Sequence, residues 1–252
     1  MDFDEKYNLM KEGGKILARI INELKAEVKE GRSLKDLDNL AEKLILDSGA
    51  KPAFKNYKAP FATRPYPYTL CTSLNEIIVH GYPKENVYLK NGDILKIDLG
   101  LNYKGYFVDA AITLGVGKIS EEAKYLIEFT KRALIEAIKI IKPGIRTGDI
   151  GWKIESVIED AELSVIKDFC GHDIGEYLHG NLEIRNFGNP GEGKLITEGM
   201  FFTIEPMASL GSGEVERIDD YVFKTKDNAL SSHFEVTLVV LKNKAEILTP
   251  IF

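Results

Sequence analysis

The sequence predicts an α+β fold, in which helices and strands occupy separate stretches of the chain. Apolar residues with helical spacing occur in two pairs of segments, near residues 4–48 and 120–160. Segments that alternate apolar and other residues occur in groups. Helices in pairs and strands in groups, without strict alternation, place the chain in the α+β class. A short pattern that recurs in both halves of the chain supports the same arrangement.

The first half is expected to hold two helices and two strands. Apolar side chains recur every three or four positions over residues 4–28, which predicts a helix. Ser33 is a suitable N-cap for a second helix, which Gly49 would end. Residues 93–99 and 106–113 alternate in the manner of strands.

The second half repeats this order. Ser120 opens a third helix, and Pro143-Gly144 closes it. A fourth helix opens at Thr147, with Asp149 in its first turn, and ends near Asp160. The strands expected here are residues 200–205 and 234–240.

A faint internal repeat links the halves. Residues 30–37 resemble residues 143–150, and each segment contains a turn glycine. Further along each half, a strand carboxylate stands six residues beyond a second turn glycine. The pairs are Gly92 with Asp98, and Gly199 with Glu205. We therefore expect one domain over residues 1–252, built from similar halves of about 1–118 and 119–252.

Charge and composition exclude several classes of protein. The 252 residues carry 33 Lys and Arg against 39 Asp and Glu, a net charge of −6, which argues against binding to DNA or anionic membranes. The longest run without a charged residue, 65–75, is half of the ~20 that a transmembrane helix needs. The acidic N-terminus does not resemble a signal peptide, and two cysteines form no disulfide framework. We expect a cytoplasmic protein.

Four acidic residues interrupt the apolar strand segments: Asp98, Asp109, Glu205 and Glu235. A single acid of this kind is usually explained by a solvent-exposed face of the sheet, but four together weaken that explanation. A buried carboxylate is costly unless it is paired or binds a metal, and Lys96 is the one basic residue inside these strands. A divalent cation such as Mn, Fe(II), Co or Zn is the simplest partner.

The chain has four histidines. His172 and His179 lie seven residues apart in a glycine-containing segment, which excludes a helical His-Glu-x-x-His zinc motif. His80 ends a short apolar strand before a Gly/Pro turn. His233 has no motif around it, and we expect a structural role for it rather than a ligand role.

In order along the chain, these motifs resemble those of methionine aminopeptidases. The matching segments are Asn75-Glu76-x3-His80-Gly81, Ile97-Asp98, Gly105-Tyr106-x2-Asp109, Gly171-His172-x-Ile174-Gly175-x3-His179, Gly199-Met200-x2-Thr203-Ile204-Glu205-Pro206-Met207 and Phe234-Glu235-x-Thr237. They lie within about residues 5–250, and the spacing of His172 and Glu205 resembles the compact type 1 form. The segment at Gly105 is more similar to the type 2 or prolidase branch. The resemblance implies the pita-bread fold of the M24 metallopeptidases, two pseudo-twofold-related halves around a central antiparallel sheet.

The resemblance also implies a centre of two divalent metal ions, Co, Mn, Fe or Zn. Its ligands would be Asp98, Asp109, His172, Glu205 and Glu235. Asp109 and Glu235 would bridge the ions. Glu205 would relay a proton to the leaving amine, His179 would donate a hydrogen bond to the oxyanion, and His80 would orient the substrate.

The implied substrate is the N-terminal methionine of peptides and nascent chains. Its side chain would enter a pocket lined by Tyr66, Cys71 and Tyr221, beside His80 and His179. A polarisable sulfur in a small apolar slot suits a thioether, although Cys71 would also fit as a small buried hydrophobe. The ribosome is a further candidate partner, no DNA or membrane partner is expected, and we expect a monomer.

The chain departs from the family pattern at four places. Asp173 stands where the family usually has glycine, and Gly180-Asn181-Leu182 replaces Glu-x-Pro after the second cleft histidine. Val236 replaces the histidine after the last ligand, and Tyr221 replaces a pocket tryptophan. None of the five proposed ligands is lost, so the departures bear on substrate range and rate.

Two alternative functions remain open on the sequence. A related pita-bread peptidase that cleaves before proline carries its last ligand in an Arg-x-Glu-Asp context, and residues 216–220 come close to it. We expect Glu216 and Asp219 to be solvated loop acids, because Glu235 lies in the better strand. A member of the fold that binds protein or RNA without catalysis is the other alternative; the complete ligand set and the negative charge argue against it.

Overall fold

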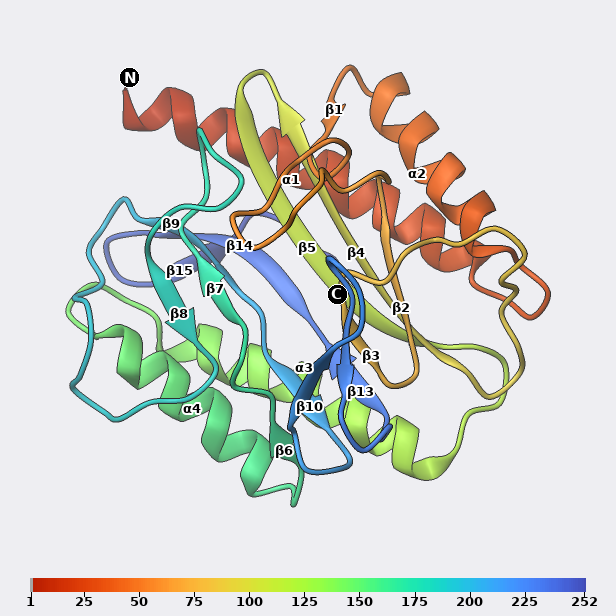
Figure 1. Cartoon of the computed structure of the whole chain (residues 1–252). Helices are drawn as coiled ribbons and strands as arrows, with labels where there is room; N and C mark the ends of the chain where they lie inside the picture. The colour runs from red at the N-terminus through yellow and green to blue at the C-terminus, as the bar shows by residue number, and fades with distance from the viewer. Residues whose placement is uncertain (1) are drawn as a thin grey trace.

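The computed structural model describes residues 2–252 and contains the four expected helices within that range (Figure 1). They are α1 (Phe3–Glu27), α2 (Leu34–Asp47), α3 (Glu121–Ile140) and α4 (Thr147–Glu159). The longer strands are β4 (Ile94–Tyr103), β5 (Tyr106–Gly115), β9 (Phe201–Ile204) and β14 (Glu235–Val240). The shorter ones are β1 (Lys51–Pro52), β2 (Cys71–Leu74), β3 (Ile77–Val79), β6 (Ser164–Val165), β7 (Cys170–His172), β8 (Glu183–Arg185), β10 (Met207–Ser209), β11 (Val215–Arg217), β12 (Phe223–Thr225), β13 (Ser231–His233) and β15 (Ala245–Ile247).

Polar side chains hydrogen-bond the first turn of α2 and of α4, whereas α1 has no side-chain cap. The Ser33 hydroxyl accepts a hydrogen bond from the Asp36 amide at 3.3 Å, as the sequence predicted for α2. α4 begins at Thr147, as the sequence predicted. The Asp149 carboxylate in its first turn accepts a hydrogen bond from the Arg146 amide at 2.7 Å.

The central sheet joins both halves of the chain. Its strand order is β1-β4-β5-β14-β15, with β2 on the outer side of β4 and β9 paired to β14. All these pairs are antiparallel, and β5 pairs with β14 where the halves meet. In Figure 1 the helices lie behind this sheet, with α1 and α2 above α3 and α4. The α+β class and the two-halved pita-bread architecture are confirmed.

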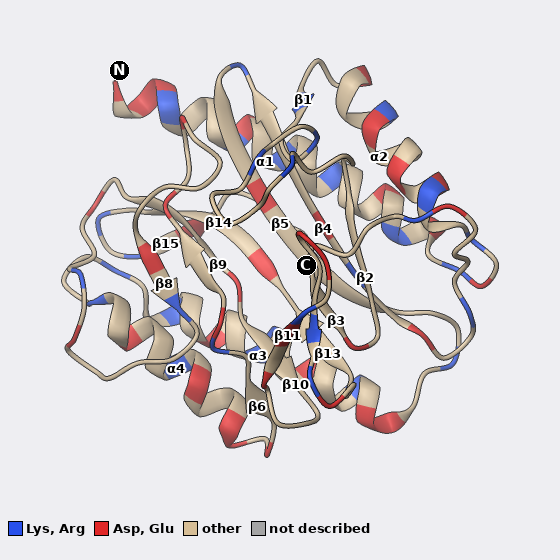
Figure 2. Cartoon of the chain, viewed as in Figure 1, with Lys and Arg blue, Asp and Glu red and all other residues tan. Residues whose placement is uncertain are grey.

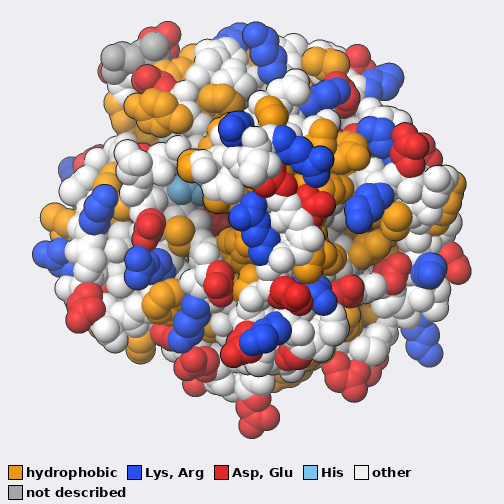
Figure 3. All heavy atoms as spheres, in the orientation of Figure 1, with side chains coloured by type: hydrophobic (Ala, Val, Ile, Leu, Met, Phe, Trp, Pro, Cys, Tyr) orange, Lys and Arg blue, Asp and Glu red, His pale blue; other side chains and the backbone are white. Residues whose placement is uncertain are grey.

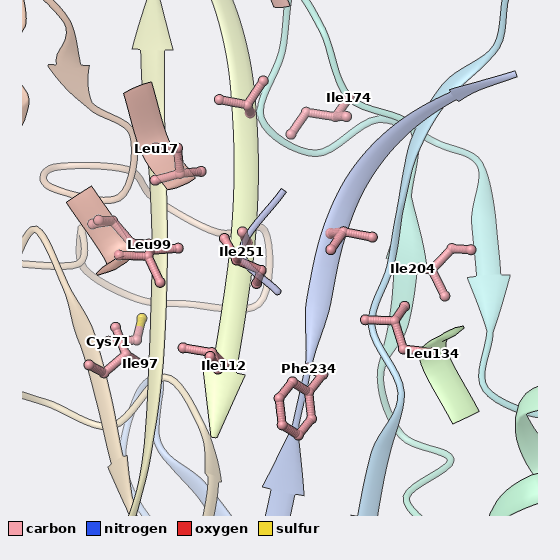
Figure 4. Packing of buried hydrophobic residues seen from close by; sticks show 14 of the residues in the cluster. Leu17, Cys71, Ile97, Leu99, Ile112, Leu134, Ile174, Ile204, Phe234 and Ile251 are labelled. Carbon is pink, nitrogen blue, oxygen red and sulfur yellow. The ribbon is translucent and has the colours of Figure 1, made fainter. Parts of the chain in front are cut away.

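One face of the sheet packs against the helices. Leu17 of α1 lies beside Leu99 of β4 in the apolar layer drawn in Figure 4, and both are fully buried. Because strand side chains alternate, Asp98 points to the opposite face. Figure 2 shows acidic positions in the middle of β4, β5 and β14, away from the charged rim of the molecule.

The internal repeat is present in the backbone hydrogen bonds. Each turn glycine adopts a positive φ, between 81° and 100°, and donates its amide to the same kind of partner in both halves. The pairs are Gly31 to Leu89 and Gly144 to Ile196, then Gly92 to Val116 and Gly199 to Val240. The carbonyl acceptors lie at 2.8–2.9 Å. The faint sequence repeat therefore reflects a repeated turn geometry.

Two predicted site residues lie just outside the strands in which they were expected. β9 ends at Ile204, so Glu205 is the first residue beyond it. His80 follows β3 with a φ of 58°, which turns the chain sharply at this residue. Among the described residues, no helix has both the length and the apolar character needed to cross a membrane.

Candidate metal centre

The register of three strands brings three carboxylates together. Asp98 of β4 and Glu235 of β14 both pair with Ala111, from opposite sides of β5. Asp109 is two residues from Ala111 and shares its face. The three side chains therefore converge on one face of the sheet at the junction of its two halves.

The second half adds Glu205 and His172. The amide of His172, at the end of β7, donates a hydrogen bond to the Thr203 hydroxyl at 3.1 Å, which anchors β7 beside β9. His172 Nε2 lies 3.8 Å from Glu205 Oε1, and the Thr203 hydroxyl donates to the same oxygen at 3.2 Å.

The five predicted ligands form overlapping groups. In each of three sets, potential ligand atoms lie within 4.8 Å of one another. The sets are His172-Glu205-Glu235, Asp98-Asp109-Glu235 and Asp109-His172-His179. All five predicted ligands lie in these sets, and His179 joins them as a sixth potential ligand.

The carboxylates are desolvated and crowd one another. Burial, followed by the charges of Asp109 and Glu205, raises the pKa of Asp98 well above its usual value. Burial also raises the pKa of Asp109 to about 7. The pKa values of Glu205 and Glu235 are raised by burial first and by Asp109 next. Like charges in a dry site favour protonation unless a cation compensates them.

No side-chain cation of residues 2–252 pairs with this cluster. Among the described residues, none of the four acids forms an ion pair with Lys or Arg, and Asp98 Oδ1 and Glu235 Oε1 have no hydrogen-bond partner. Lys96 lies on the same face of β4 and is fully buried, but it donates to the carbonyl oxygens of Asn75 and Ser231 at 2.6 and 3.0 Å. Unpartnered buried oxygens and a nearby imidazole fit divalent metal ions.

His80 and His179 line the same cavity as the cluster. His179 Nδ1 lies 2.9 Å from the Tyr57 hydroxyl, and its ring centre lies 4.4 Å from that of His172. His80 Nδ1 lies 3.3 Å from the Tyr221 carbonyl oxygen, which can only accept, so Nδ1 carries the proton. Burial lowers the pKa of His80 to about 4, which keeps its ring neutral.

A cavity of about 740 Å³ opens over the acids and holds every predicted site residue. Figure 3 looks into this hollow, where histidine and acidic atoms are visible between hydrophobic side chains. The aromatic residues that line it are Phe54, Tyr57, Phe61, Tyr66, Phe169, Tyr221 and Phe223. The cavity is therefore acidic at its floor and apolar on its walls.

The three predicted pocket residues lie in the wall of this cavity. Cys71 pairs with Asp98 across β2 and β4, which puts it on the same face as the acids. The Tyr66 hydroxyl lies 3.1 Å from the carbonyl oxygens of Leu70 and Gly81, so it is occupied within the protein. The ring of Tyr221 meets that of Tyr66 edge-on, with centroids 5.2 Å apart.

The sequence did not single out several wall residues. Phe61, Phe169 and Phe223 surround the ring of His80, with centroids 6.1–6.2 Å from it. Phe61 and Phe169 stand in loops without a periodic pattern, so no sequence signal separated them from ordinary core aromatics. A hydrophobic residue close to a motif histidine was the only available clue.

His233 is also part of the cavity wall. It is 2 % exposed, and neither ring nitrogen has a hydrogen-bond partner among the described residues. Its Nε2 lies 4.0 Å from Glu235 Oε2. A buried histidine with a structural role is normally hydrogen-bonded. His233 has no such bond among the described residues, so this observation does not support the expected structural role.

The acids that the alternative function would use lie outside the cluster. Glu216 pairs with Lys224 at 3.4 Å, and Asp219 accepts hydrogen bonds from Arg64 and Tyr82. Neither carboxylate belongs to any of the metal-compatible groups.

Two departures from the family pattern depend on each other. The Asp173 carboxylate accepts a hydrogen bond from the Leu182 amide at 2.5 Å, and the Asp173 carbonyl accepts one from the Gly180 amide at 2.8 Å. A Cβ atom at position 180 would overlap the Asp173 carboxyl group. Asp173 in this position therefore requires glycine directly after His179.

The fold and the acidic cavity define a metal-dependent hydrolase of known type. The model of metallopeptidase family M24 matches residues 8–241, and the chain belongs to this family. A prolidase structure from Pyrococcus horikoshii shares the fold, with a TM-score of 0.74 at 20 % identity, over 98 % of this chain and 62 % of the prolidase.

Methionine aminopeptidases are much more similar. The one from Clostridium perfringens is 40 % identical over 247 residues, which cover 98 % of this chain and 96 % of the relative. The crystal structure of the enzyme from Thermotoga maritima has a TM-score of 0.93 at 38 % identity, over 97 % and 96 % of the two chains. The one from Rickettsia prowazekii has a TM-score of 0.93 at 35 % identity, over 98 % and 97 %. Within the family, the chain thus groups with the methionine aminopeptidases.

Proposed function

We propose that this chain removes the N-terminal methionine from peptides and nascent chains by metal-dependent hydrolysis of the first peptide bond. The observation that carries the proposal is the cluster of four buried carboxylates and His172, without a side-chain cation, at the floor of an apolar cavity. The similarity to methionine aminopeptidases over nearly the whole chain supports the same substrate.

Two divalent ions, Mn, Fe(II), Co or Zn, are the proposed cofactors. Their ligands would be Asp98, Asp109, His172, Glu205 and Glu235, with Asp109 and Glu235 shared between the ions. The chemistry that such ions supply when bound is polarisation of the scissile carbonyl and acidification of the attacking water. The buried, unpartnered oxygens of Asp98 and Glu235 support this assignment.

The chain's own side chains would carry the proton and orient the substrate. Glu205 would accept a proton from the attacking water and donate it to the leaving amine. His179 would donate a hydrogen bond to the oxyanion of the tetrahedral intermediate. His80, whose Nδ1 is held by the Tyr221 carbonyl, would present Nε2 near the scissile nitrogen.

The first side chain of the substrate would enter the apolar part of the cavity. Tyr66, Cys71 and Tyr221 line it together with the two histidines. A flexible thioether fills an aromatic slot well and contacts rings favourably. An apolar wall for this side chain, next to acids that would hold the metal, suits an exopeptidase.

The decisive experiment is release of free methionine from Met-Ala-Ser. Metal-free protein would be tested with Mn, Fe(II), Co or Zn returned singly, and we expect release only with added metal. Glu235→Ala should lose metal and activity together, whereas the matched variant Glu216→Ala should keep both. A peptide with proline second, tested in parallel, identifies the alternative peptidase. Metal-loaded protein that releases nothing from either peptide would contradict the proposal.

The remaining expectations concern the cellular setting. We propose a cytoplasmic monomer that acts on chains as they emerge, with the ribosome as a candidate partner. The negative net charge is consistent with a substrate recognised by its first residue rather than by nucleic acid. Sedimentation of the purified chain, alone and with ribosomes, tests both points.

A further inference from the structure

A loop without regular structure, residues 57–66, forms one wall of the cavity. A single carboxylate holds its outer part. Asp220 accepts hydrogen bonds from the amides of Thr63 and Arg64 and from the Thr63 hydroxyl, all at 3.0 Å. The Thr63 amide, with the other hydrogen bonds, keeps the pKa of Asp220 below its usual value, so this acid is a carboxylate at neutral pH.

Neighbours of Asp220 reinforce the attachment. Arg217 donates to the Asp220 carbonyl at 2.6 Å, to its carboxylate at 3.2 Å and to the Phe61 carbonyl at 3.3 Å. The Tyr221 hydroxyl contacts the carbonyl oxygens of Tyr57 and Arg64 at 3.1 and 2.9 Å. We call this set of bonds between residues 217–221 and the loop the Asp220 clamp.

The clamp places Phe61 at the mouth of the cavity. Its ring lies nearly parallel to that of His80, with centroids 6.1 Å apart and planes 22° apart. It meets Tyr221 and Phe223 edge-on at 5.8 and 5.9 Å, and the Arg217 guanidinium lies 5.7 Å from its centre. Phe61 is nevertheless 47 % exposed, because its outer part borders the open cavity.

We propose that Phe61, held by the Asp220 clamp, determines the specificity of the cavity for the first residue of the substrate. The inference rests on the proposed function. The ring closes the side of the cavity next to His80, so an unbranched side chain fits and a broader one meets Phe61. Asp220 acts as a positioning residue, because it touches the loop and lies outside the cavity lining.

The physical argument is the limited mobility of this wall. A loop of ten residues with no secondary structure would otherwise adapt to many side chains and discriminate poorly among them. Three donors of the loop bind this one carboxylate and restrict that freedom at Thr63 and Arg64, two and three residues beyond Phe61. A difference of one methylene group in a rigid apolar pocket changes kcat/KM by about 10- to 200-fold. A mobile wall would lose this discrimination between substrates.

The test compares kcat/KM for Met-Ala-Ser, Leu-Ala-Ser and Phe-Ala-Ser with the metal-loaded full chain. We expect Phe61→Ala to lower the Met-over-Leu ratio by about tenfold or more, chiefly through KM. Asp220→Ala should shift the ratio in the same direction, and the double variant should add little to Phe61→Ala. Asp220→Asn keeps one acceptor oxygen and should retain part of the selectivity.

Asp227→Ala is the matched control. Asp227 accepts hydrogen bonds from the amides of Ser212 and Ala229 in a loop outside the cavity, so its loss should leave the ratio unchanged. An unchanged Met-over-Leu ratio in Phe61→Ala would overturn the inference, and so would an equal shift in Asp227→Ala. In either case, release of methionine by the wild type would still uphold the proposed function. A metal-loaded wild type that releases no first residue would overturn both.

Discussion

His179 has two possible roles, and its surroundings separate them. It belongs to one metal-compatible group with Asp109 and His172, but it is also exposed to the cavity and contacts the Tyr57 hydroxyl at 2.9 Å. We expect His179→Ala to bind metal normally and to lose about 10²- to 10³-fold in kcat, the usual effect of removing one oxyanion donor. Tyr57→Phe, which keeps the imidazole, should lose less. Calorimetric titration with Mn compares the metal affinity of His179→Ala with that of the wild type. Weaker binding by the variant would identify His179 as a metal ligand.

Lys96 is a residue whose role the sequence left undefined. It is the one basic residue in the apolar strands that contain the four acids. Its Nζ donates to the carbonyl oxygens of Asn75 and Ser231 instead of to an acid. Lys96→Met would remove the donor that joins these two carbonyl oxygens, and the Asn75 oxygen would keep only its bonds from Ser231. We expect a loss of about 2–3 kcal/mol in the free energy of unfolding, measured by urea denaturation. The exposed Lys15→Met should change it by less than about 0.5 kcal/mol.

Residues in strands were easier to predict than residues in loops. Asp98, Asp109 and Glu235 stand in apolar segments of period two, so alternation predicted which face of its own strand each acid shares, and the number of such acids argued against a solvent-exposed face. Phe61 and the Asp220 clamp were not predictable, because the contact joins loops 157 residues apart and neither has a periodic pattern. The unpartnered state of His233 depends on three-dimensional packing in the same way.

At the scale of elements, helix ends and strand centres followed from local rules, while the placement of α1 needed the whole fold. The hydrophobic spacing of α1 predicted a buried stripe but not its partners. Gly14, on that stripe, faces the chain beyond β15, where a Cβ atom would overlap the carbonyl oxygen of Leu248. Two segments more than 230 residues apart therefore meet at a glycine that a helix would otherwise disfavour.

Gly14→Ala tests this packing. Alanine favours the helix, but here the added methyl group must displace the backbone at Leu248. We expect a net loss of about 1–3 kcal/mol in the free energy of unfolding, typical of an overpacked core. The exposed neighbour Lys15→Ala is the control and should be nearly neutral. A more stable Gly14→Ala chain in urea denaturation would show that α1 is free to move away.

At the scale of the whole molecule, metal binding should stabilise the fold. The five proposed ligands come from both halves, so the complete set exists only in the folded chain. A metal ion that binds only the native state adds about 2.7 kcal/mol to the free energy of unfolding when its free concentration is 100 times the dissociation constant. This corresponds to a rise of roughly 5–10 °C in Tm for a chain of this size. Scanning calorimetry with and without Mn measures it. His172→Ala should show a clearly smaller rise in Tm on addition of Mn. A rise equal to that of the wild type would mean that the ion binds at a site without His172.

The pairing of β5 with β14 has a consequence for how the protein is made. Asp98 and Asp109 are synthesised in the first half of the chain, whereas Glu235 arrives only with the last long strand. A translation product that stops anywhere before this strand lacks the proposed ligand Glu235 and the strand that pairs with β5 on the side opposite β4. Such a fragment, even with its first half folded, cannot complete the five-ligand centre. The proposed metal centre is therefore complete only once nearly the whole chain has been synthesised.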